Sequence, residues 1–150
     1  MEKMKPVKCV VTGASGFVGS RIADCLRNKG FVVYEMGRRK SDKLADEKRF
    51  IPFELGKPVD AAVFRGKDTL IHCAYDFKLA KENVQRINVA GSIGILRAAK
   101  ASGVKKIIFI SSFAAFKDAK SVYGRAKFAI EQEAAKLGVI IVKPSMIFGK

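Results

Sequence analysis

A chain of 150 residues in which 49% of the side chains are hydrophobic can form one domain with a packed core, and it is too apolar for a disordered protein. No apolar run reaches the roughly 18 residues of a membrane-spanning helix, and the short apolar run near the N-terminus lacks the cleavage site of a signal peptide, so we expect no membrane partner. The formal net charge of +15 would suit a nucleic-acid partner, but the lysines are scattered and no nucleic-acid-binding motif accompanies them, which favours a solvated basic surface.

Short apolar runs alternate along the chain with segments of helical periodicity. The runs predict strands at 7–11, 31–36, 49–53, 68–74, 105–111 and 139–144. The periodic segments between them predict helices at 17–29, 57–65, 80–102 and 121–137. Strands that are apolar throughout are buried on both faces, and their alternation with helices gives repeated βαβ units. We therefore predict a single α/β domain over residues 1–150 with a doubly wound parallel sheet, the Rossmann fold.

Glycines mark three of the expected helix ends. Gly30, Gly103 and Gly138 each follow a predicted helix, at the position where a residue with positive φ commonly ends the helical hydrogen bonding.

The use of cysteine and histidine argues against disulfides and metal sites. Cys9, Cys25 and Cys73 are odd in number, widely spaced and set among apolar residues. We expect them to be small buried core side chains in a reducing, cytoplasmic compartment. Because His72 is the only histidine, we expect no metal centre.

Three glycines stand where the first predicted strand turns into the first predicted helix, in "TGASGFVGS". In a doubly wound sheet ligands bind at this point, beyond the carboxyl ends of the strands. Gly13 would permit the tight turn, Gly16 would let the backbone approach a pyrophosphate, and Gly19 would let the helix pack closely on the sheet. The free N–H groups at the helix N-terminus would bind the phosphates. The alternative is a glycine-rich turn that holds no ligand.

The G-x-x-G-x-x-G spacing of this stretch resembles the cofactor loop of the short-chain dehydrogenase/reductase superfamily, especially its extended branch of epimerases, dehydratases and reductases. Five further stretches match in the family's order across residues 7–149: "RFIPFELGKP", "DTLIHCAYDF", "NVAGSIGILRAAKASGVKKIIFISS", "SVYGRAK" and "VKPSMIFG".

The resemblance implies NAD(P) as the cofactor and assigns residues to it. Glu54 and Leu55, at the end of the third predicted strand, would hold the adenine, and Ala74 would lie beside the cofactor. The complete cofactor-binding set that the resemblance implies is Gly13, Ser15, Gly16, Phe17, Val18, Gly19, Arg38, Arg39, Glu54, Leu55, Ala74, Lys127 and Pro144.

Tyr123 and Lys127 form the Y-x-x-x-K signature of that superfamily. Residues four apart on a helix project from one face, and an ammonium beside a phenol favours the phenolate. Tyr123 would then exchange a proton with the substrate oxygen while hydride moves at the adjacent carbon, and Lys127 would hydrogen-bond the cofactor ribose. The resemblance places Ser112, in preference to Ser111, at the reacting oxygen. The alternative is an ordinary exposed pair of side chains at i and i+4.

The end of the second predicted strand indicates which dinucleotide would bind. Proteins of this kind that prefer NAD carry an acidic residue there for the ribose 2′-hydroxyl. This chain has Gly37 at that position, followed by Arg38 and Arg39, while Glu35 falls two residues earlier, inside the strand. We predict NADP over NAD, with Arg38 as the main contact to the 2′-phosphate and Arg39 stacking on the adenine. If both arginines are only solvated surface charges, NAD is the cofactor.

Three features depart from the family pattern or allow a structural role. Ser112 and Tyr123 are only eleven residues apart, closer than in typical extended members. The chain ends at Lys150, where family members continue into a substrate-binding region, so we expect that region to be absent, in either a fragment or a natural minimal form. Asn88 matches an asparagine of the superfamily, and we expect it to make a structural contact with the backbone.

Two functional hypotheses follow. The first is an NAD(P)-dependent oxidoreductase, epimerase or dehydratase that acts on a small molecule, for which a nucleotide sugar is the family's commonest substrate. The second is a module that binds or senses the dinucleotide without catalysis. Because the predicted strand at 139–143 would lie near an exposed sheet edge, we also expect a homo-oligomer.

Overall fold

A computed structural model describes residues 5–148 of the chain. Its strands are β1 (Lys8–Thr12), β2 (Val32–Gly37), β3 (Phe50–Pro52), β4 (Thr69–His72), β5 (Lys106–Ile110) and β6 (Ile140–Val142). Its α-helices are α1 (Phe17–Asn28), α2 (Lys81–Val84), α3 (Ala90–Ala101) and α4 (Val122–Lys136). Short 3₁₀ turns, η1 (Glu47–Arg49) and η2 (Ala61–Phe64), and a π-helical segment, η3 (Gln85–Val89), complete the order.

The strands form one parallel sheet in the order β3-β2-β1-β4-β5-β6. Strand β1 lies in the middle of this order, where Cys9 is paired with Val33 on one side and with Thr69 on the other. The order reverses beside β1, so the crevice at the carboxyl ends of β1 and β4 is the topological switch point of the sheet. The prediction of a doubly wound α/β fold is confirmed.

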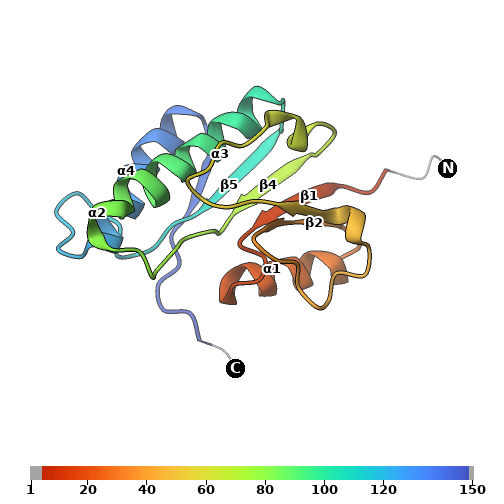
Figure 1. Ribbon diagram of the computed structural model, residues 1–150, viewed down its shortest axis with the longest axis horizontal. Coiled ribbons are helices and arrows are strands. Elements are labelled where there is room, and N and C mark those ends of the chain that lie inside the picture. Colours follow the sequence, from red (N-terminus) through yellow and green to blue (C-terminus); the bar gives the residue numbers. More distant parts are fainter. Residues whose placement is uncertain (1–4, 149–150) are drawn as a thin grey trace.

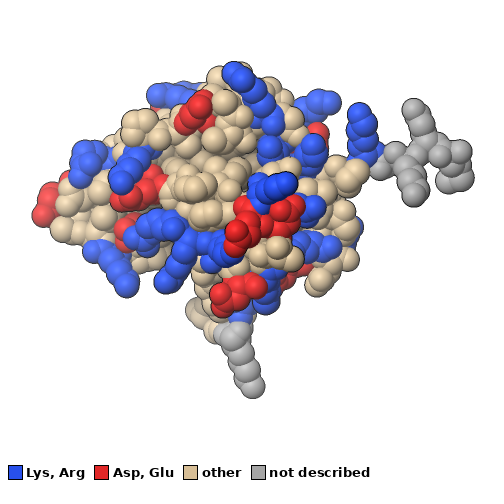
Figure 2. All heavy atoms as spheres, turned by 45° about the vertical axis from the view of Figure 1, so that its right-hand side comes forward, with Lys and Arg blue, Asp and Glu red and all other residues tan. Residues whose placement is uncertain are grey.

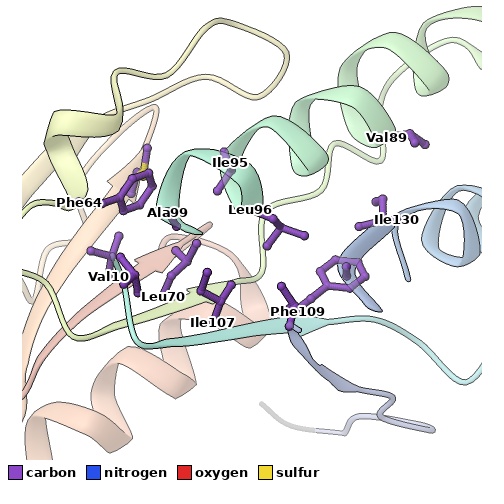
Figure 3. Packing of buried hydrophobic residues seen from close by; sticks show 14 of the residues in the cluster. Val10, Phe64, Leu70, Val89, Ile95, Leu96, Ala99, Ile107, Phe109 and Ile130 are labelled. Atoms are coloured by element: carbon purple, nitrogen blue, oxygen red, sulfur yellow. The ribbon is translucent and has the colours of Figure 1, made fainter. Parts of the chain in front are cut away.

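Helices cover both faces of the sheet (Figure 1). Helix α1 packs on one face, where Val11, Val33 and Ile71 meet Ala23 in a small apolar cluster. Helices α3 and α4 cover the other face and enclose the larger cluster. Figure 3 shows its centre, where Val10, Leu70, Ile107 and Phe109 of the strands meet Ile95, Leu96 and Ala99 of α3 and Ile130 of α4. The described strands and helices therefore share one core and hold the crevice between two packed layers.

The prediction of a helix at 57–65 is wrong. In its place the chain runs without regular structure to Asp60, whose carboxylate caps the short turn η2 by accepting a hydrogen bond from the amide of Ala62 (2.8 Å). Gly56, with φ of 89°, turns the chain before the segment, Pro58 disfavours the helical conformation of Lys57, and Gly66 turns the chain after it. Val59 and Val63 are nonetheless partly buried against the core, and Phe64 is completely buried.

The helix predicted at 80–102 forms, but it contains a wide turn. Helix α2 leads into the π-helical segment η3 before α3 begins. Such insertions shift the side chains that follow them around the helix axis, and they occur frequently at functional sites. Here the insertion spans Ile87 and Asn88, both of which contribute to the site described below.

The glycines predicted to end helices all do so. Gly30, Gly103 and Gly138 have φ of 82°, 80° and 70°, and they follow α1, α3 and α4. No helix of the described part of the chain is long and apolar enough to cross a membrane. The N-terminal residues 1–4 and Gly149 of the quoted "VKPSMIFG" lie outside the described residues.

The prediction that all three cysteines are buried is only partly right. Cys9 is buried, Cys73 is half-buried, and Cys25 is exposed. Helix α1 buries Gly19 and Ala23 against its neighbours. Cys25 follows Ala23 by two residues, about 200° around the helix, and therefore points to solvent.

Charged side chains are mixed on the face of the molecule in Figure 2, where Asp and Glu lie among Lys and Arg. Salt bridges of the described part of the chain include Lys40 to Glu47, Lys57 to Glu54 and Arg97 to Glu133. Mixed charge of this kind is typical of a solvated surface.

Candidate active site

A cleft of about 660 Å³ lies at the carboxyl ends of the strands. The segments that follow β1, β2, β3, β4, β5 and β6 all contribute to its walls, together with the first turns of α1 and α4. Every predicted cofactor-binding and catalytic residue lines this one cleft. The sequence motifs are therefore brought together by the fold, while the roles assigned to the single residues stay predictions.

The glycine loop between β1 and α1 is held by close backbone contacts. Gly13 has φ of 67°, and a Cβ atom there would lie 2.9 Å from the Cα of Ala74. A Cβ atom at Gly19 would lie 2.2 Å from the carbonyl oxygen of Gly13, so this glycine lets α1 pack on the loop itself more than on the sheet. At Gly16 only the Gly13 oxygen is near, at 3.2 Å, and the other side is open. The open side faces the cleft beside the N-terminus of α1, which suits an anionic group.

Thr12 and His72 join β1 to β4 directly behind this loop. The side-chain oxygen of Thr12 accepts hydrogen bonds from the amides of Cys73 (3.0 Å) and Ala74 (3.2 Å) and lies 2.7 Å from Nδ1 of His72. His72 is fully buried, and desolvation, aided by the charge of Lys127, lowers its pKa to about 3. The contacts fix the backbone of Ala74 where it borders the cleft.

At the end of the cleft next to β2 and β3, basic side chains face the space in which the resemblance places the adenosine. Arg38 and Arg39 are exposed and line the cleft, and Arg39 also borders an adjoining cavity of about 450 Å³. Glu35 does not line the cleft, since its buried carboxylate pairs with Arg27 and accepts hydrogen bonds from the amide and hydroxyl of Ser41. No acidic side chain of β2 therefore reaches this part of the cleft.

Glu54 and Leu55 line the same end of the cleft from the segment after β3. This segment is held close to helix α3. A Cβ atom at Gly91 of α3 would lie 2.6 Å from the amide nitrogen of Gly56. The glycine in "NVAGS" thus allows the helix to approach the segment that follows Leu55.

Ser112, Tyr123 and Lys127 line the cleft on the β5 side, away from β2 and β3 in the strand order. Ser112 follows β5, while Tyr123 and Lys127 lie one turn apart on α4, whose N-cap is the hydroxyl of Ser121. The eleven-residue interval between Ser112 and Tyr123 is closed tightly, because a Cβ atom at Gly124 would lie 2.4 Å from the carbonyl oxygen of Ala114. The short loop therefore packs directly against the first turn of α4.

Lys127 is almost completely buried, with 3% of its surface exposed. Its ammonium donates a hydrogen bond to the carbonyl oxygen of Ile110 (2.9 Å) and lies over the rings of Phe109 (4.8 Å), Tyr75 (5.1 Å) and Tyr123 (5.8 Å). Desolvation lowers its pKa to about 8, against the smaller opposing effects of Cys73 and Glu131.

Two aromatic residues of the cleft were missed by the sequence predictions. Tyr75 and Phe77 follow β4 and form a three-ring cluster with Tyr123. The centroid of the Tyr123 ring lies 5.0 Å from that of Tyr75 and 5.5 Å from that of Phe77. Phe77 is 75% exposed. The signal was present in "HCAYDF", because aromatic side chains that directly follow a strand of a parallel sheet fall at the ligand-binding edge.

Asn88 makes the structural contact expected of it. Its side-chain oxygen accepts a hydrogen bond from the amide of Asp76, and its Nδ2 donates one to the carbonyl oxygen of Asp76, both over 2.9 Å. The π-helical segment that contains Asn88 therefore holds the loop between Tyr75 and Phe77. Within residues 5–148 no group of three His, Cys, Asp or Glu side chains is placed to bind a metal ion.

Comparison with known proteins agrees with this arrangement. Residues 9–150 match the model of the NAD dependent epimerase/dehydratase family. The chain belongs to this family. The finding confirms the resemblance of the sequence to epimerases and dehydratases.

Individual epimerase/dehydratase proteins and related structures share the fold at low identity. UDP-glucose 4-epimerase of Vibrio cholerae is 24% identical to this chain over an alignment of 177 residues. The alignment covers 99% of this chain and 54% of the epimerase. The structure of UDP-glucuronic acid 4-epimerase from Bacillus cereus in complex with NAD has 21% sequence identity to this chain and a TM-score of 0.78. The match covers 95% of this chain and 58% of the epimerase chain. The structure of MoeE5 in complex with UDP-glucose and NAD has 23% sequence identity and a TM-score of 0.72, and the match covers 93% of this chain and 52% of the MoeE5 chain. The chain spans about half the length of these proteins.

Proposed function

We propose that this chain forms the cofactor-binding and acid–base half of an NAD(P)-dependent epimerase, dehydratase or reductase that acts at a carbon bearing a hydroxyl or carbonyl group. One observation carries the proposal. The glycine loop and the group of Ser112, Tyr123 and Lys127 line a single cleft at the switch point of a parallel sheet. Membership of the NAD dependent epimerase/dehydratase family supports the same reaction class.

The residues of the cleft fit a dinucleotide. The close contacts at Gly13 and Gly19 leave no room for side chains, and the open side of Gly16 at the N-terminus of α1 would receive the pyrophosphate. NAD(P), when bound, supplies or accepts the hydride. Tyr123 donates the proton to the substrate oxygen in reduction and removes it in oxidation, Lys127 favours its phenolate form, and Ser112 hydrogen-bonds the reacting oxygen.

We infer that NADP is preferred over NAD. Gly37 leaves space beside the adenosine end of the cleft, Arg38 and Arg39 supply planar cationic donors there, and the carboxylate of Glu35 is occupied by Arg27 and Ser41. The related structures with bound NAD favour the alternative, in which both arginines are solvated and NAD is the cofactor.

The substrate proposed is a nucleotide sugar, since relatives named for UDP-sugars share the family and the fold. Strand β6 lies at the edge of the sheet with Ile140 and Val142 exposed, which supports self-association into a homo-oligomer. Half-buried and buried thiols at Cys73 and Cys9 suit a cytoplasmic location.

Calorimetric titration with NAD and NADP tests the proposal. Gly16 is the N-cap of α1 with φ of −84°, a position and conformation that suit Asp and Asn, and either residue adds the same Cβ atom 3.2 Å from the Gly13 oxygen. The variant Gly16→Asp places a negative charge where the pyrophosphate binds, whereas Gly16→Asn has the same shape without the charge. We expect Gly16→Asp to weaken dinucleotide affinity at least about tenfold more than Gly16→Asn. Equal affinities in the two variants, or no binding by the parent chain, would contradict the proposed site.

The same titration decides the cofactor. Arg38→Ala and Arg39→Ala are expected to lower NADP affinity while leaving NAD affinity within about twofold, because only NADP carries the 2′-phosphate. An Arg38→Ala variant that loses nothing for NADP would refute the assigned contact. Dinucleotide binding without turnover of any hydroxyl or carbonyl substrate would favour a non-catalytic cofactor module.

A further inference from the structure

A buried carboxylate lies beneath the catalytic end of the cleft and outside its lining. Glu131 is one turn beyond Lys127 on α4, and only 7% of its surface is exposed. Both of its oxygens are occupied: Oε1 accepts a hydrogen bond from the hydroxyl of Ser111, and Oε2 accepts one from the ammonium of Lys143 (3.1 Å). Both oxygens therefore act as acceptors, and the ammonium of Lys143 faces one of them.

Two consecutive residues before Ser112 are thereby bonded to α4. The ammonium of Lys127 donates to the carbonyl oxygen of Ile110 (2.9 Å), and the carboxylate of Glu131 accepts from Ser111. On the other side of this segment, the amide of Ser111 donates to the carbonyl oxygen of Val142 (2.8 Å). The position of Ser112 relative to Tyr123 is therefore set by contacts from one helix and one neighbouring strand.

Lys143 extends the same network to the loop after Ser112. Besides its ion pair with Glu131, its ammonium donates a hydrogen bond to the carbonyl oxygen of Ala115. The amide of Phe113 donates to the carbonyl oxygen of Pro144 (3.0 Å). Residues on both sides of Ser112 are thus tied to the group formed by Glu131 and Lys143.

We propose that Glu131 is a positioning residue of this site, which holds the segment of Ser112 in register with α4 and Tyr123 and places a negative charge one turn from Lys127, with Lys143 as its counter-ion. The proposal rests on the proposed acid–base function of Ser112, Tyr123 and Lys127.

The electrostatic part follows from the groups that surround Lys127. Burial beside His72 and under the rings of Tyr75 and Tyr123 disfavours its ammonium form and lowers its pKa. Cys73, and after it Glu131, act in the opposite direction and raise the pKa of Lys127. A protonated Lys127 is the form that favours the phenolate of Tyr123, so the carboxylate acts on Tyr123 through Lys127.

The test measures the titration of Lys127 itself in the ligand-free chain. The ¹⁵N shift of its Nζ is followed by NMR from pH 6 to 11, and the resonance is assigned by its absence in Lys127→Arg. Three variants are compared with the parent. Glu131→Gln removes the charge and keeps the shape, Lys143→Met removes the counter-ion, and Glu133→Gln removes a carboxylate of the same helix that pairs with Arg97 and Lys136 at the surface.

Glu131→Gln is expected to lower the Lys127 pKa by about one pH unit, because the ammonium loses a favourable partner. Lys143→Met is expected to raise it, since the carboxylate is then less compensated and a like charge is gone. Glu133→Gln should leave it unchanged. Opposite shifts in the first two variants cannot arise from loosened packing, which would act alike in both.

An unchanged Lys127 pKa in Glu131→Gln, or shifts of the same sign in Glu131→Gln and Lys143→Met, would overturn the proposal. If Glu131→Gln does not fold, a lowered Lys127 pKa in Lys143→Met overturns it equally. Dinucleotide titration of the same samples separates the two ideas, because the proposed function fails if the parent chain does not bind NAD(P), whatever the titration of Lys127 shows.

Discussion

The side-chain oxygen of Thr12 lies 2.7 Å from Nδ1 of His72, in the buried middle of the sheet. The Thr12 oxygen already accepts hydrogen bonds from the amides of Cys73 and Ala74, so its own proton is donated to Nδ1. The imidazole must then carry its hydrogen on Nε2, which has no hydrogen-bond partner within the described residues. His72 is therefore held neutral by an interaction that a protonated ring would destroy.

This arrangement predicts a loss of stability in mild acid. The folded pKa of His72 is about 3 and its ordinary value is 6.5, so the unfolded chain binds the additional proton between these values. The free energy of unfolding should fall as the pH drops from 6.5 toward 3, by up to about 1.4 kcal/mol per pH unit. Urea unfolding at several pH values in this range measures the slope.

His72→Asn is the comparison, because its oxygen accepts the Thr12 proton and does not titrate. Since the chain has one histidine, the difference in slope between parent and variant belongs to His72 alone. Identical slopes in both proteins would show that the burial of a neutral imidazole does not govern acid stability.

Lys127 predicts a pH dependence of the same sign at alkaline pH. Its folded pKa of about 8 lies below the ordinary 10.5, so the unfolded chain binds more protons above pH 8 and the free energy of unfolding should rise with pH. Burial raises the pKa of Cys73 from 9.0 to about 12, which opposes this gain above pH 9. We expect a rise between pH 8 and 9 that flattens above 9 and continues in Cys73→Ala. Lys127→Met should lack the rise, as chemical unfolding at these pH values will show.

The close approach of α4 to the loop after Ser112 predicts a large effect from one methyl group. A Cβ atom at Gly124 would lie 2.4 Å from the Ala114 oxygen and 2.9 Å from the Cβ of Ala119, so Gly124→Ala should destabilise the fold by about 1–3 kcal/mol. Gly94→Ala is the matched control, because Gly94 lies on α3 with nothing within 4 Å of its added methyl group. It should stabilise the fold by about 0.5–1 kcal/mol. Thermal unfolding of both variants measures these changes in stability. A Gly124→Ala variant as stable as the parent would refute the close contact between α4 and the loop.

Tyr123→Phe tests the acid–base assignment once a substrate is found. The phenylalanine keeps the ring contacts to Tyr75 and Phe77 and removes only the hydroxyl. Turnover should fall by about 10²–10⁴-fold, the usual contribution of a positioned acid–base group, with dinucleotide affinity little changed. Tyr34→Phe, on β2 beneath Lys67, should leave turnover as it is. Turnover near the parent value in Tyr123→Phe would assign proton transfer to another group.

Much of the fold was predictable because its signals are local. The runs that became β1 and β4 are apolar at their centres, and in the sheet these centres are buried on both faces, as at Val10, Val11, Leu70 and Ile71. The segment 57–65 misled the prediction because its apolar residues do reach the core, Phe64 among them, but they do so from a loop and a single 3₁₀ turn. Periodicity reports burial more reliably than backbone conformation.

The site was predictable where a motif fixes the backbone, as at Gly13 and Gly19. Glu131 could not be assigned in this way, since a glutamate in a polar helical stretch is typical of a solvent-exposed position. Its partners Ser111 and Lys143 are 20 and 12 residues away, and only the pairing of β5 with β6 brings them together. Contacts of this kind depend on the register of the sheet, which no local pattern contains.

The central place of β1 has a consequence for the order in which the chain folds. Its first partner, β2, becomes available soon after it along the chain, but its second edge pairs with β4, from Thr69 to His72. During synthesis, at about 5–20 residues per second, that apolar edge waits a few seconds with unpaired amides and carbonyls. The nascent chain is thus most exposed to aggregation between the emergence of β2 and that of β4, and chaperone binding would matter most in this interval.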